Sequence, residues 1–350
     1  MLTRQWMLAV HWVAANQIRL TGDDSEYRSR LARVTDSVQQ VQAAADALPG
    51  LWMTRNRRVG GSHAQRAVLD AISLYMLQSA KHAVEADVRR LALDTGYGRT
   101  TVHAALRVLA EDGRWIRRVG VAEGANGQRY QLAERFSTEV YGSDRTQAYT
   151  RRSTEPPPGA QQALITQLGT KLGCLAHDIF CSPHSLGRLS GLIYLVLPEA
   201  EGGSTLSDLV LATGADIDVV RTRLHRLQDA GLVRLTDEGW RRCFVTVRDF
   251  AARALGVDGY LADRARRYAR ERIIWGWWLK ELEWMSARGK PRRGKLPSFA
   301  LFQDPRGGMP AWPRAPEPRA TKRLARWSDA AKLVDAGVLS GLLDANTTAA

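Results

Sequence analysis

Four side chains of the kind that bind zinc fall within eleven residues of the sequence, at Cys174, His177, Cys181 and His184. On a single helix these positions would spread over about 15 Å of its axis. A tetrahedral site instead needs all four ligands within roughly 2.0–2.3 Å of one ion. They could converge only if the helix broke near Pro183, so we expect ordinary buried cysteines and capping histidines, and no bound metal.

Motifs that would indicate catalysis do not occur in the sequence. It contains no G-x-x-x-x-G-K-[ST] phosphate loop, no G-x-S-x-G nucleophile turn and no H-x-H pair. Asp216 and Asp218 form an isolated acidic pair without a third carboxylate at a predicted strand end, as a two-metal site would require. We therefore expect a binding protein rather than an enzyme, with no cofactor.

A different group of side chains has the chemistry of nucleic-acid recognition. Arg99, Thr100, Thr101, His103 and Arg107 lie within nine residues. An arginine can bond guanine O6 and N7 together, and threonine hydroxyls can bind phosphate or cap a helix. The alternative, that Arg99 and Arg107 are solvated surface charges, stays open.

Two neighbouring segments could extend this group. Asn126, Gln128 and Arg129 lie at the tip of a predicted β-hairpin, from which they could reach an adjacent groove or the phosphate backbone. Tyr97 precedes the group and could stack against a sugar or pack beside a turn.

An internal repeat indicates which elements position these residues. Residues 88–113 and 206–231 align without a gap at a constant offset of 118. The coinciding pairs are Leu91/Leu209, Thr95/Thr213, Gly96/Gly214, Leu106/Leu224, Leu109/Leu227 and Gly113/Gly231. Each copy is expected to form two helices joined by a tight turn, with Gly96 or Gly214 at positive φ. The second helix would pack through Val102, Leu106 and Leu109, or through Val220, Leu224 and Leu227.

Strand patterns follow each pair of helices. Residues 115–119 and 128–132 flank a glycine-rich turn in the first copy, and residues 232–236 and 240–247 flank the turn sequence Asp-Glu-Gly in the second. A helix-turn-helix followed by a β-hairpin is a winged helix. We expect a mainly α protein with small β-hairpin wings and two tandem winged-helix domains; two helical hairpins used only for packing are the alternative.

The second copy differs where the first would meet DNA. Ile217 and Asp218 replace Arg99 and Thr100, and Asp216 precedes them as a suitable N-cap. Carboxylates there repel phosphate, while cations recur further along the helix. These later side chains, which we also include as candidate DNA contacts, are Arg221, His225 and Arg226. Two interpretations stay open: binding of DNA with a shifted footprint, or a role in dimerisation or packing.

Charge is concentrated near the end of the chain. The 350 residues contain 50 Lys and Arg against 36 Asp and Glu, a net charge of +14. Between residues 263 and 323 there are 16 Lys and Arg against six Asp and Glu. We expect Arg292, Arg293 and Lys295 to belong to an arm that binds phosphates without sequence preference. The tryptophans at 275–278 could anchor a helix to a core or stack on unpaired bases of single-stranded DNA.

Length and composition predict several segments. We expect an N-terminal helical segment at 1–60, winged helices at 61–140 and 164–256, a linker at 141–163 that contains three consecutive prolines, and a basic helix and arm at 257–350. The longest apolar run, at 192–197, is far short of a membrane span, so no membrane partner is expected. Three cysteines cannot build a disulfide framework, and a cytoplasmic location is expected.

The sequence also resembles a known family. Residues 60–120, then HDIFCSPHSLG at 177–187 and the second helix-turn-helix, resemble the tandem winged-helix region of actinobacterial plasmid and integrative-element replication proteins. The basic segment RARRYARERIIW at 264–275 is also similar, and the resemblance covers about residues 52–290. In that family the region often follows a primase-polymerase or helicase part.

The resemblance implies a double-stranded DNA-binding protein for replication initiation or origin binding on a mobile element. A transcriptional repressor or autoregulator using the same surface is the alternative, and an accessory subunit of a primase or other DNA-processing enzyme is the third hypothesis. Self-association or contact with a replication enzyme would be compatible with each of these.

Overall fold

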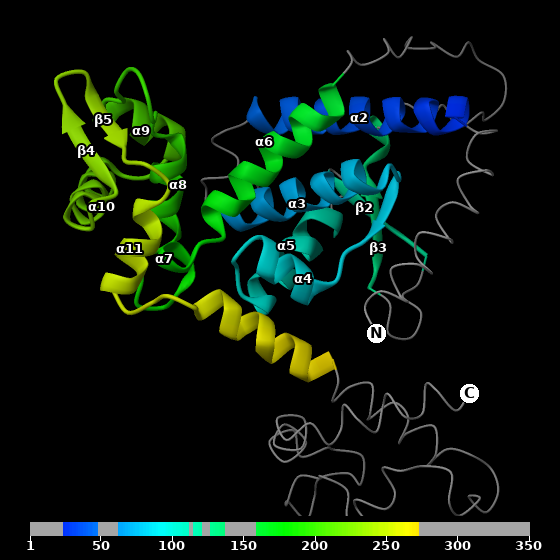
Figure 1. The fold of residues 1–350 in the computed structure, drawn as a ribbon. Coiled ribbons are helices and arrows are strands. Elements are labelled where there is room, and N and C mark those ends of the chain that lie inside the picture. The colour runs from blue at the N-terminus through cyan, green and yellow to red at the C-terminus, as the bar shows by residue number, and fades with distance from the viewer. Residues whose placement is uncertain (1–23, 48–61, 112–114, 121–126, 137–158, 273–350) are drawn as a thin grey trace, which may run out of the picture. The chain divides into compact units, whose positions relative to one another are not determined.

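The computed structural model describes residues 24–47, 62–111, 115–120, 127–136 and 159–272. It is mainly helical with small antiparallel sheets, as the sequence predicted (Figure 1). Residues 24–261 belong to one compact unit. Within the part of the chain described here, no helix is both long enough and apolar enough to cross a membrane.

The first half of this unit is built on helix α3, whose inward face is buried along its length. Its start is fixed by a capping box, in which Ser62 and Gln65 each accept a hydrogen bond from the other's backbone N–H. The elements of this half are α2 (Asp24–Asp46), α3 (His63–Ser79), β1 (Ala83–Glu85), α4 (Val88–Asp94), α5 (Arg99–Glu111), β2 (Ile116–Val119), β3 (Arg129–Leu132) and the 3-10 turn η2 (Glu134–Phe136).

The three strands form an antiparallel sheet in the order β1-β3-β2. β2 and β3 are the hairpin expected from the sequence, with Ile116 opposite Leu132 and Val119 opposite Arg129. β1 was not predicted, because three residues are too few to show an alternating pattern. It lies between α3 and α4 in the sequence, and it pairs with β3 as an edge strand of the sheet.

The second half repeats part of this order. Its elements are α6 (Ala160–Leu175), α7 (Asp178–Cys181), α8 (Arg188–Val196), α9 (Leu206–Thr213), α10 (Ile217–Asp229), β4 (Val233–Thr236), β5 (Gly239–Arg242) and α11 (Val247–Ala254). β4 and β5 pair as an antiparallel hairpin. In place of a third strand, Ser204 forms a single antiparallel bridge to Trp240. Tyr194 and Phe180 are among the largest side chains in the core of this half.

The two copies match in their local contacts. Gly96 and Gly214 both have positive φ, +70° and +59°, as predicted for the turns. Just before them, the buried hydroxyls of Thr95 and Thr213 each donate to the carbonyl four residues earlier, at 2.6 Å in both copies. The same hydroxyls accept from the backbone N–H two residues later, at 3.4 and 3.5 Å. The sequence alignment is therefore also a structural alignment of the turns.

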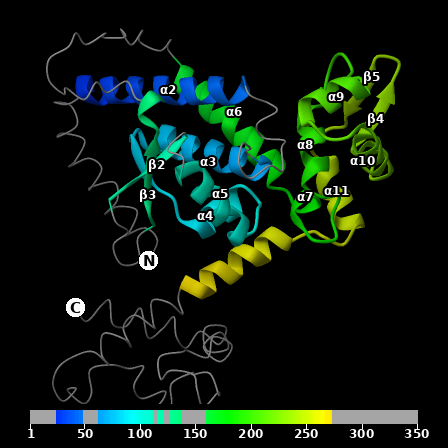
Figure 2. The ribbon, with the colours of Figure 1, turned by 180° about the vertical axis from the view of Figure 1, so that it is seen from behind.

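Helix α6 lies where the sequence predicted the end of a linker. It begins at Ala160, so the last residues of the expected linker are helical. Figures 1 and 2 show α6 against α3 from both sides, and the two helices pack together. The Lys171 ammonium lies 2.7 Å from the carboxylate of Asp70 on α3, whose side chain has no exposed surface. Gln161 donates to the Leu77 carbonyl at 2.7 Å.

The return strand of the second hairpin is shorter than predicted. The sequence favoured strand over residues 240–247, but β5 ends at Arg242 and α11 begins at Val247. The N–H of Val247 donates to the Phe244 carbonyl at 3.0 Å, and that of Arg248 to the Val245 carbonyl at 3.2 Å. These local hydrogen bonds occupy backbone groups that a longer strand would have used to pair with β4.

A further helix covers residues 260–272 and is the described part of the long basic helix expected from the sequence. The tryptophans at 275–278, the basic arm after residue 288, and residues 1–23 and 48–60 of the expected N-terminal segment lie outside the described residues.

Candidate nucleic-acid interface

Helix α5 presents one polar face and buries the other. Val102, Ala105, Leu106 and Leu109, spaced three or four residues apart, are buried against the first half. The predicted contact residues all lie on the opposite, exposed face: Arg99, Thr100, Thr101, His103 and Arg107. Burial of the apolar stripe thus fixes which side of the helix meets solvent.

The exposed face of α5 is polar and carries positive charge along its length. Arg99 is the first residue of the helix, and hydroxyls follow it at the next two positions. Arg107 pairs with Glu111 one turn later, at 3.1 Å, with both side chains more than half exposed. Such an exposed pair contributes little to stability, so Arg107 can exchange this partner for a phosphate at small cost.

The hairpin formed by β2 and β3 carries exposed arginine side chains. Arg118 and Arg129 are exposed on β2 and β3, while Arg117 donates to Glu134 at 2.8 Å. The Gln128 amide donates to the carbonyls of Gly120 and Val119, at 3.1 and 3.4 Å, so it closes the hairpin in this structure. Asn126, predicted as a contact at the tip, lies outside the described residues.

An open groove of about 610 Å³ lies beside the edge strand β1. Lys81, Arg90 and Arg129 line it together with Glu85 and Tyr75. The Arg90 guanidinium lies 4.1 Å from the centre of the Tyr75 ring, a cation–π contact. Sequence reasoning named only Arg129, because the groove depends on β1, which gave no sequence signal.

Helix α10 presents a different surface at the matching positions. Ile217 and Val219 are exposed, at 44% and 42%, and Asp218 lies between them. Asp216 is the N-cap, as predicted, and accepts from the Asp218 N–H at 2.9 Å. The Asp218 carboxylate is 2.6 Å from Arg221, so the first cation of this helix is already paired.

Further along α10 the remaining predicted contacts are exposed. His225 and Arg226 are both exposed, and the centres of the His225 and Trp240 rings lie 6.1 Å apart in a T-shaped arrangement. The first turn of α10 therefore offers methyl groups and carboxylates, whereas the first turn of α5 offers a guanidinium and hydroxyls.

Arg188, the first residue of α8, contacts the turn that precedes α5. Its guanidinium donates to the Thr95 carbonyl and lies 3.7 Å from the centre of the Tyr97 ring. It also donates to the Leu175 carbonyl and to the Cys181 sulfur, each at 2.8 Å. Tyr97 therefore packs beside the turn, and its stacking against a sugar stays a prediction.

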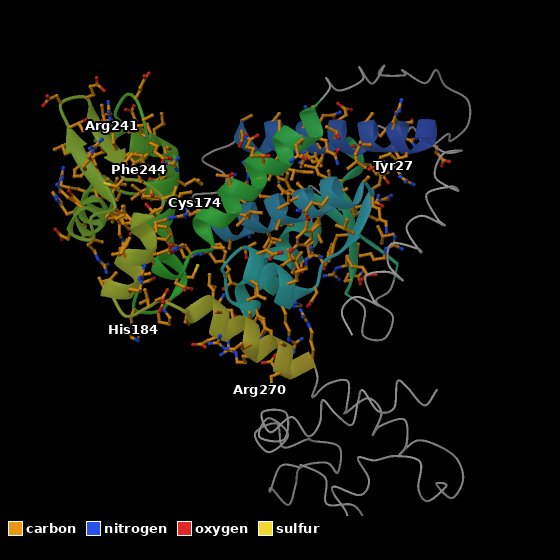
Figure 3. All side chains as sticks on the ribbon, in the orientation of Figure 1. Tyr27, Cys174, His184, Arg241, Phe244 and Arg270 are labelled. Carbon is orange, nitrogen blue, oxygen red and sulfur yellow. The ribbon has the colours of Figure 1, made fainter. Side chains whose placement is uncertain are left out.

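The cysteine and histidine stretch does not form one helix. α6 ends at Leu175, α7 covers only four residues, and His184 is exposed after it (Figure 3). Cys174 is buried, and burial raises the pKa of its thiol. Among the described residues, no group of three or more His, Cys, Asp or Glu side chains is arranged to hold a metal ion.

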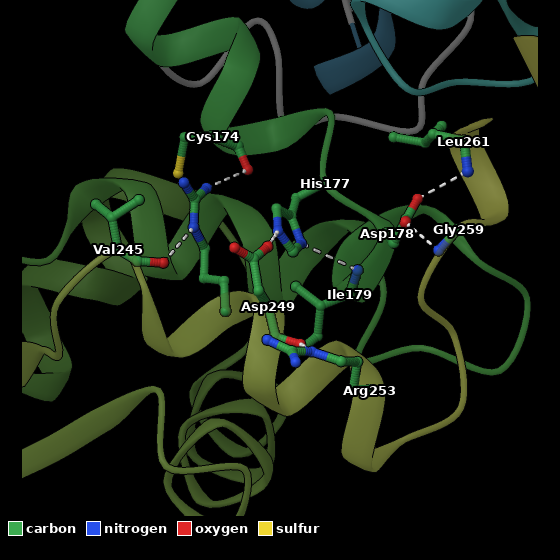
Figure 4. Close-up of polar contacts among 10 residues, drawn as sticks. Cys174, His177, Asp178, Ile179, Val245, Asp249, Arg253, Gly259 and Leu261 are labelled. Carbon is green, nitrogen blue, oxygen red and sulfur yellow. Dashed lines mark hydrogen bonds and ion pairs between the residues drawn. The ribbon is translucent and has the colours of Figure 1, made fainter.

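His177 and Asp178 have structural partners instead (Figure 4). His177 is the N-cap of α7, where its Nδ1 accepts from the Ile179 N–H at 3.3 Å and its Nε2 lies 3.0 Å from Asp249 on α11. The Asp178 carboxylate accepts from the backbone N–H groups of Gly259 and Leu261, both at 2.8 Å. These contacts fasten α11 and the chain that follows it to α7.

The predicted phosphate-binding cations Arg292, Arg293 and Lys295 lie outside the described residues. Comparisons of this chain with protein-family models, with curated proteins and with solved structures find no match.

Proposed function

We propose that this protein binds double-stranded DNA through two winged helices, of which the first reads the major groove with α5. The main support is the division of α5 into a buried apolar stripe and an exposed face carrying Arg99, two threonines, His103 and Arg107. The order α3-β1-α4-α5-β2-β3 supports the proposal, because it matches the order expected for a winged helix. In such domains, the N-terminal part of the second helix of the turn enters the major groove.

The second copy has a different role in this proposal. The hairpin β4-β5 follows α9 and α10 as a wing, and the Ser204–Trp240 bridge stands where β1 stands in the first copy. The acidic and apolar first turn of α10 disfavours contact with phosphate. We therefore assign the second winged helix a role in packing against the first one rather than in reading DNA. Arg221, His225 and Arg226 then contribute at most contacts at the edge of the DNA footprint.

The biological role we propose is recognition of a replication origin on a plasmid or integrative element, in the cytoplasm. The resemblance of residues 52–290 to replication proteins of such elements supports this role. A repressor is the second candidate, because one reading helix per chain suits a palindromic site bound by two chains.

Selection of bound duplexes from a random library, followed by mapping of the sites in the host genome, tests the proposal. We expect enrichment of a defined duplex motif, clustered at an origin. Sites at promoters would favour the repressor instead. No enrichment, or equal retention of single strands and duplexes, would contradict double-stranded recognition.

A further inference from the structure

A cavity of about 240 Å³ lies within the compact unit, and none of the residues that line it belongs to α5. Side chains from α2, α3, α6, α8 and α9 line it. The apolar part of the lining includes Leu175, Leu192, Leu195 and Val196. The volume is below the range of about 300–1,000 Å³ that is usual for drug-sized ligands, so an occupant would be a smaller molecule.

The lining of the cavity also carries charge. Arg66 lies 2.7 Å from Asp46 and 2.8 Å from Asp70, and Lys171 lies 2.7 Å from the second oxygen of Asp70. These side chains form a row of alternating charge, with two cations and two carboxylates. Because each charge faces an opposite one, the row as a whole is neutral.

Arg188 is the third cation of the lining and makes it positive overall. Its contacts among the described residues are two carbonyl groups, the Cys181 sulfur and the face of Tyr97, none of which is a carboxylate. One negative charge would therefore balance the lining. A charge in a cavity that is partly closed from water needs such a partner more than one on the surface does.

His63 supplies a polar group beside these charges. Burial lowers the pKa of its imidazole, so the ring is neutral at neutral pH. A neutral imidazole can donate one hydrogen bond and accept another. The lining thus combines apolar side chains, a cation that contacts no carboxylate among the described residues, and a neutral hydrogen-bonding ring.

We propose that this cavity binds a small organic carboxylate with an apolar body, whose charge pairs with Arg188. The same guanidinium holds the Thr95 carbonyl and the Tyr97 ring, in the turn that leads into α5. A bound carboxylate competes for this guanidinium and so alters the turn. The second step, a change in DNA affinity, rests on the proposed function; the binding itself does not.

Calorimetric titration of the full chain with 2-naphthoate tests the binding, and 2-naphthamide serves as a neutral molecule of the same shape. We expect saturable binding of naphthoate at millimolar concentration or below, with one site per chain, and binding of naphthamide at least tenfold weaker. Equal affinities for the two molecules would contradict the proposal that a negative charge on the ligand pairs with Arg188. No saturable binding of either molecule would overturn the site itself.

Substitutions on one helix locate the binding. Ala212→Trp on α9 fills the cavity, whereas Leu211→Trp adds the same ring at a side chain that is 78% exposed and outside the lining. We expect the first to abolish naphthoate binding and the second to keep it. If Ala212→Trp does not fold, Val196→Trp on α8 fills the cavity from a partly exposed position. Unchanged binding in a folded cavity-filling variant would contradict the location.

Affinity for a duplex, measured with and without naphthoate, tests the coupling. We expect a change of roughly fivefold or more, the lower end of typical coupling between two sites. Naphthoate that binds but leaves DNA affinity unchanged would overturn the coupling. A chain that binds naphthoate but no DNA would contradict the proposed function and leave the cavity assignment supported.

Discussion

Asp70 is a carboxylate without exposed surface in the middle of α3, a helix whose other inward side chains are mostly apolar. Arg66 on its own helix and Lys171 on α6 both contact it. A buried charge of this kind is tolerated only because its partners are close and fixed. The pair with Lys171 also makes the contact between α3 and α6 specific.

Removal of this carboxylate should be strongly destabilising. We expect Asp70→Ala to lower the free energy of unfolding by about 3–5 kcal/mol, the usual cost of leaving a buried pair without one partner. Urea denaturation measures this. Glu111→Ala, which removes an exposed pair with Arg107, is the matched control and should cost no more than about 1 kcal/mol. Equal losses in the two variants would show that the Asp70 network is not a buried one.

Residue types alone predicted part of the candidate site. The apolar spacing of α5 and the repeat together indicated that Arg99 and its neighbours would be exposed, and they are. The pairs Arg107–Glu111 and Asp218–Arg221 follow from helical spacing and could have been predicted too. Arg188 could not, since it contacts Thr95 across 93 residues of sequence, and no local pattern reports such a contact.

Among the elements, the turn between α4 and α5 leaves little room for a side chain at its glycine. Gly96 has a φ of +70°, and a Cβ built there would lie 2.5 Å from the Cys181 sulfur and 2.7 Å from a nitrogen of Arg188. An alanine therefore meets both backbone strain and a steric clash. The glycine allows α8 to approach the turn that leads into α5.

We expect Gly96→Ala to cost about 2–5 kcal/mol of unfolding free energy, the sum of left-handed strain and overpacking. Gly231 is a suitable control, because its φ is also +70° but nothing lies within 4 Å of an added Cβ. Gly231→Ala should cost only about 1–2 kcal/mol. Denaturant unfolding of both variants measures the difference, and similar values would contradict the close approach of α8.

Helices whose apolar residues recur over several turns were predicted best. α5 and α10 match the positions expected from the repeat, because an apolar stripe repeated over several turns is a strong signal. The short elements were not: β1 was missed, and β5 was predicted too long. Their extent depends on backbone partners, such as Gln131 for Ala83, that are distant in the sequence.

At the scale of the whole molecule, charge is distributed unevenly. The net charge of +14 lies largely between residues 263 and 323. If that segment contacts phosphates without regard to sequence, deletion of residues 289–350 should weaken binding to selected and random duplexes alike. The plot of log affinity against log salt concentration should also become less steep, because fewer counterions are released. An unchanged slope in the folded, truncated chain would contradict this role.

Whether α5 reads the DNA is tested most directly by the affinities of Arg99→Ala and Asp218→Ala for a selected duplex and its scrambled version. We expect Arg99→Ala to weaken binding to the selected duplex by about 1–3 kcal/mol and to relax preference at one base pair. Asp218→Ala should bind as well as the unchanged chain or slightly better, because a carboxylate that repels phosphate is removed and Arg221 is released. A neutral Arg99→Ala together with lost specificity in Asp218→Ala would show that α10, not α5, reads the DNA.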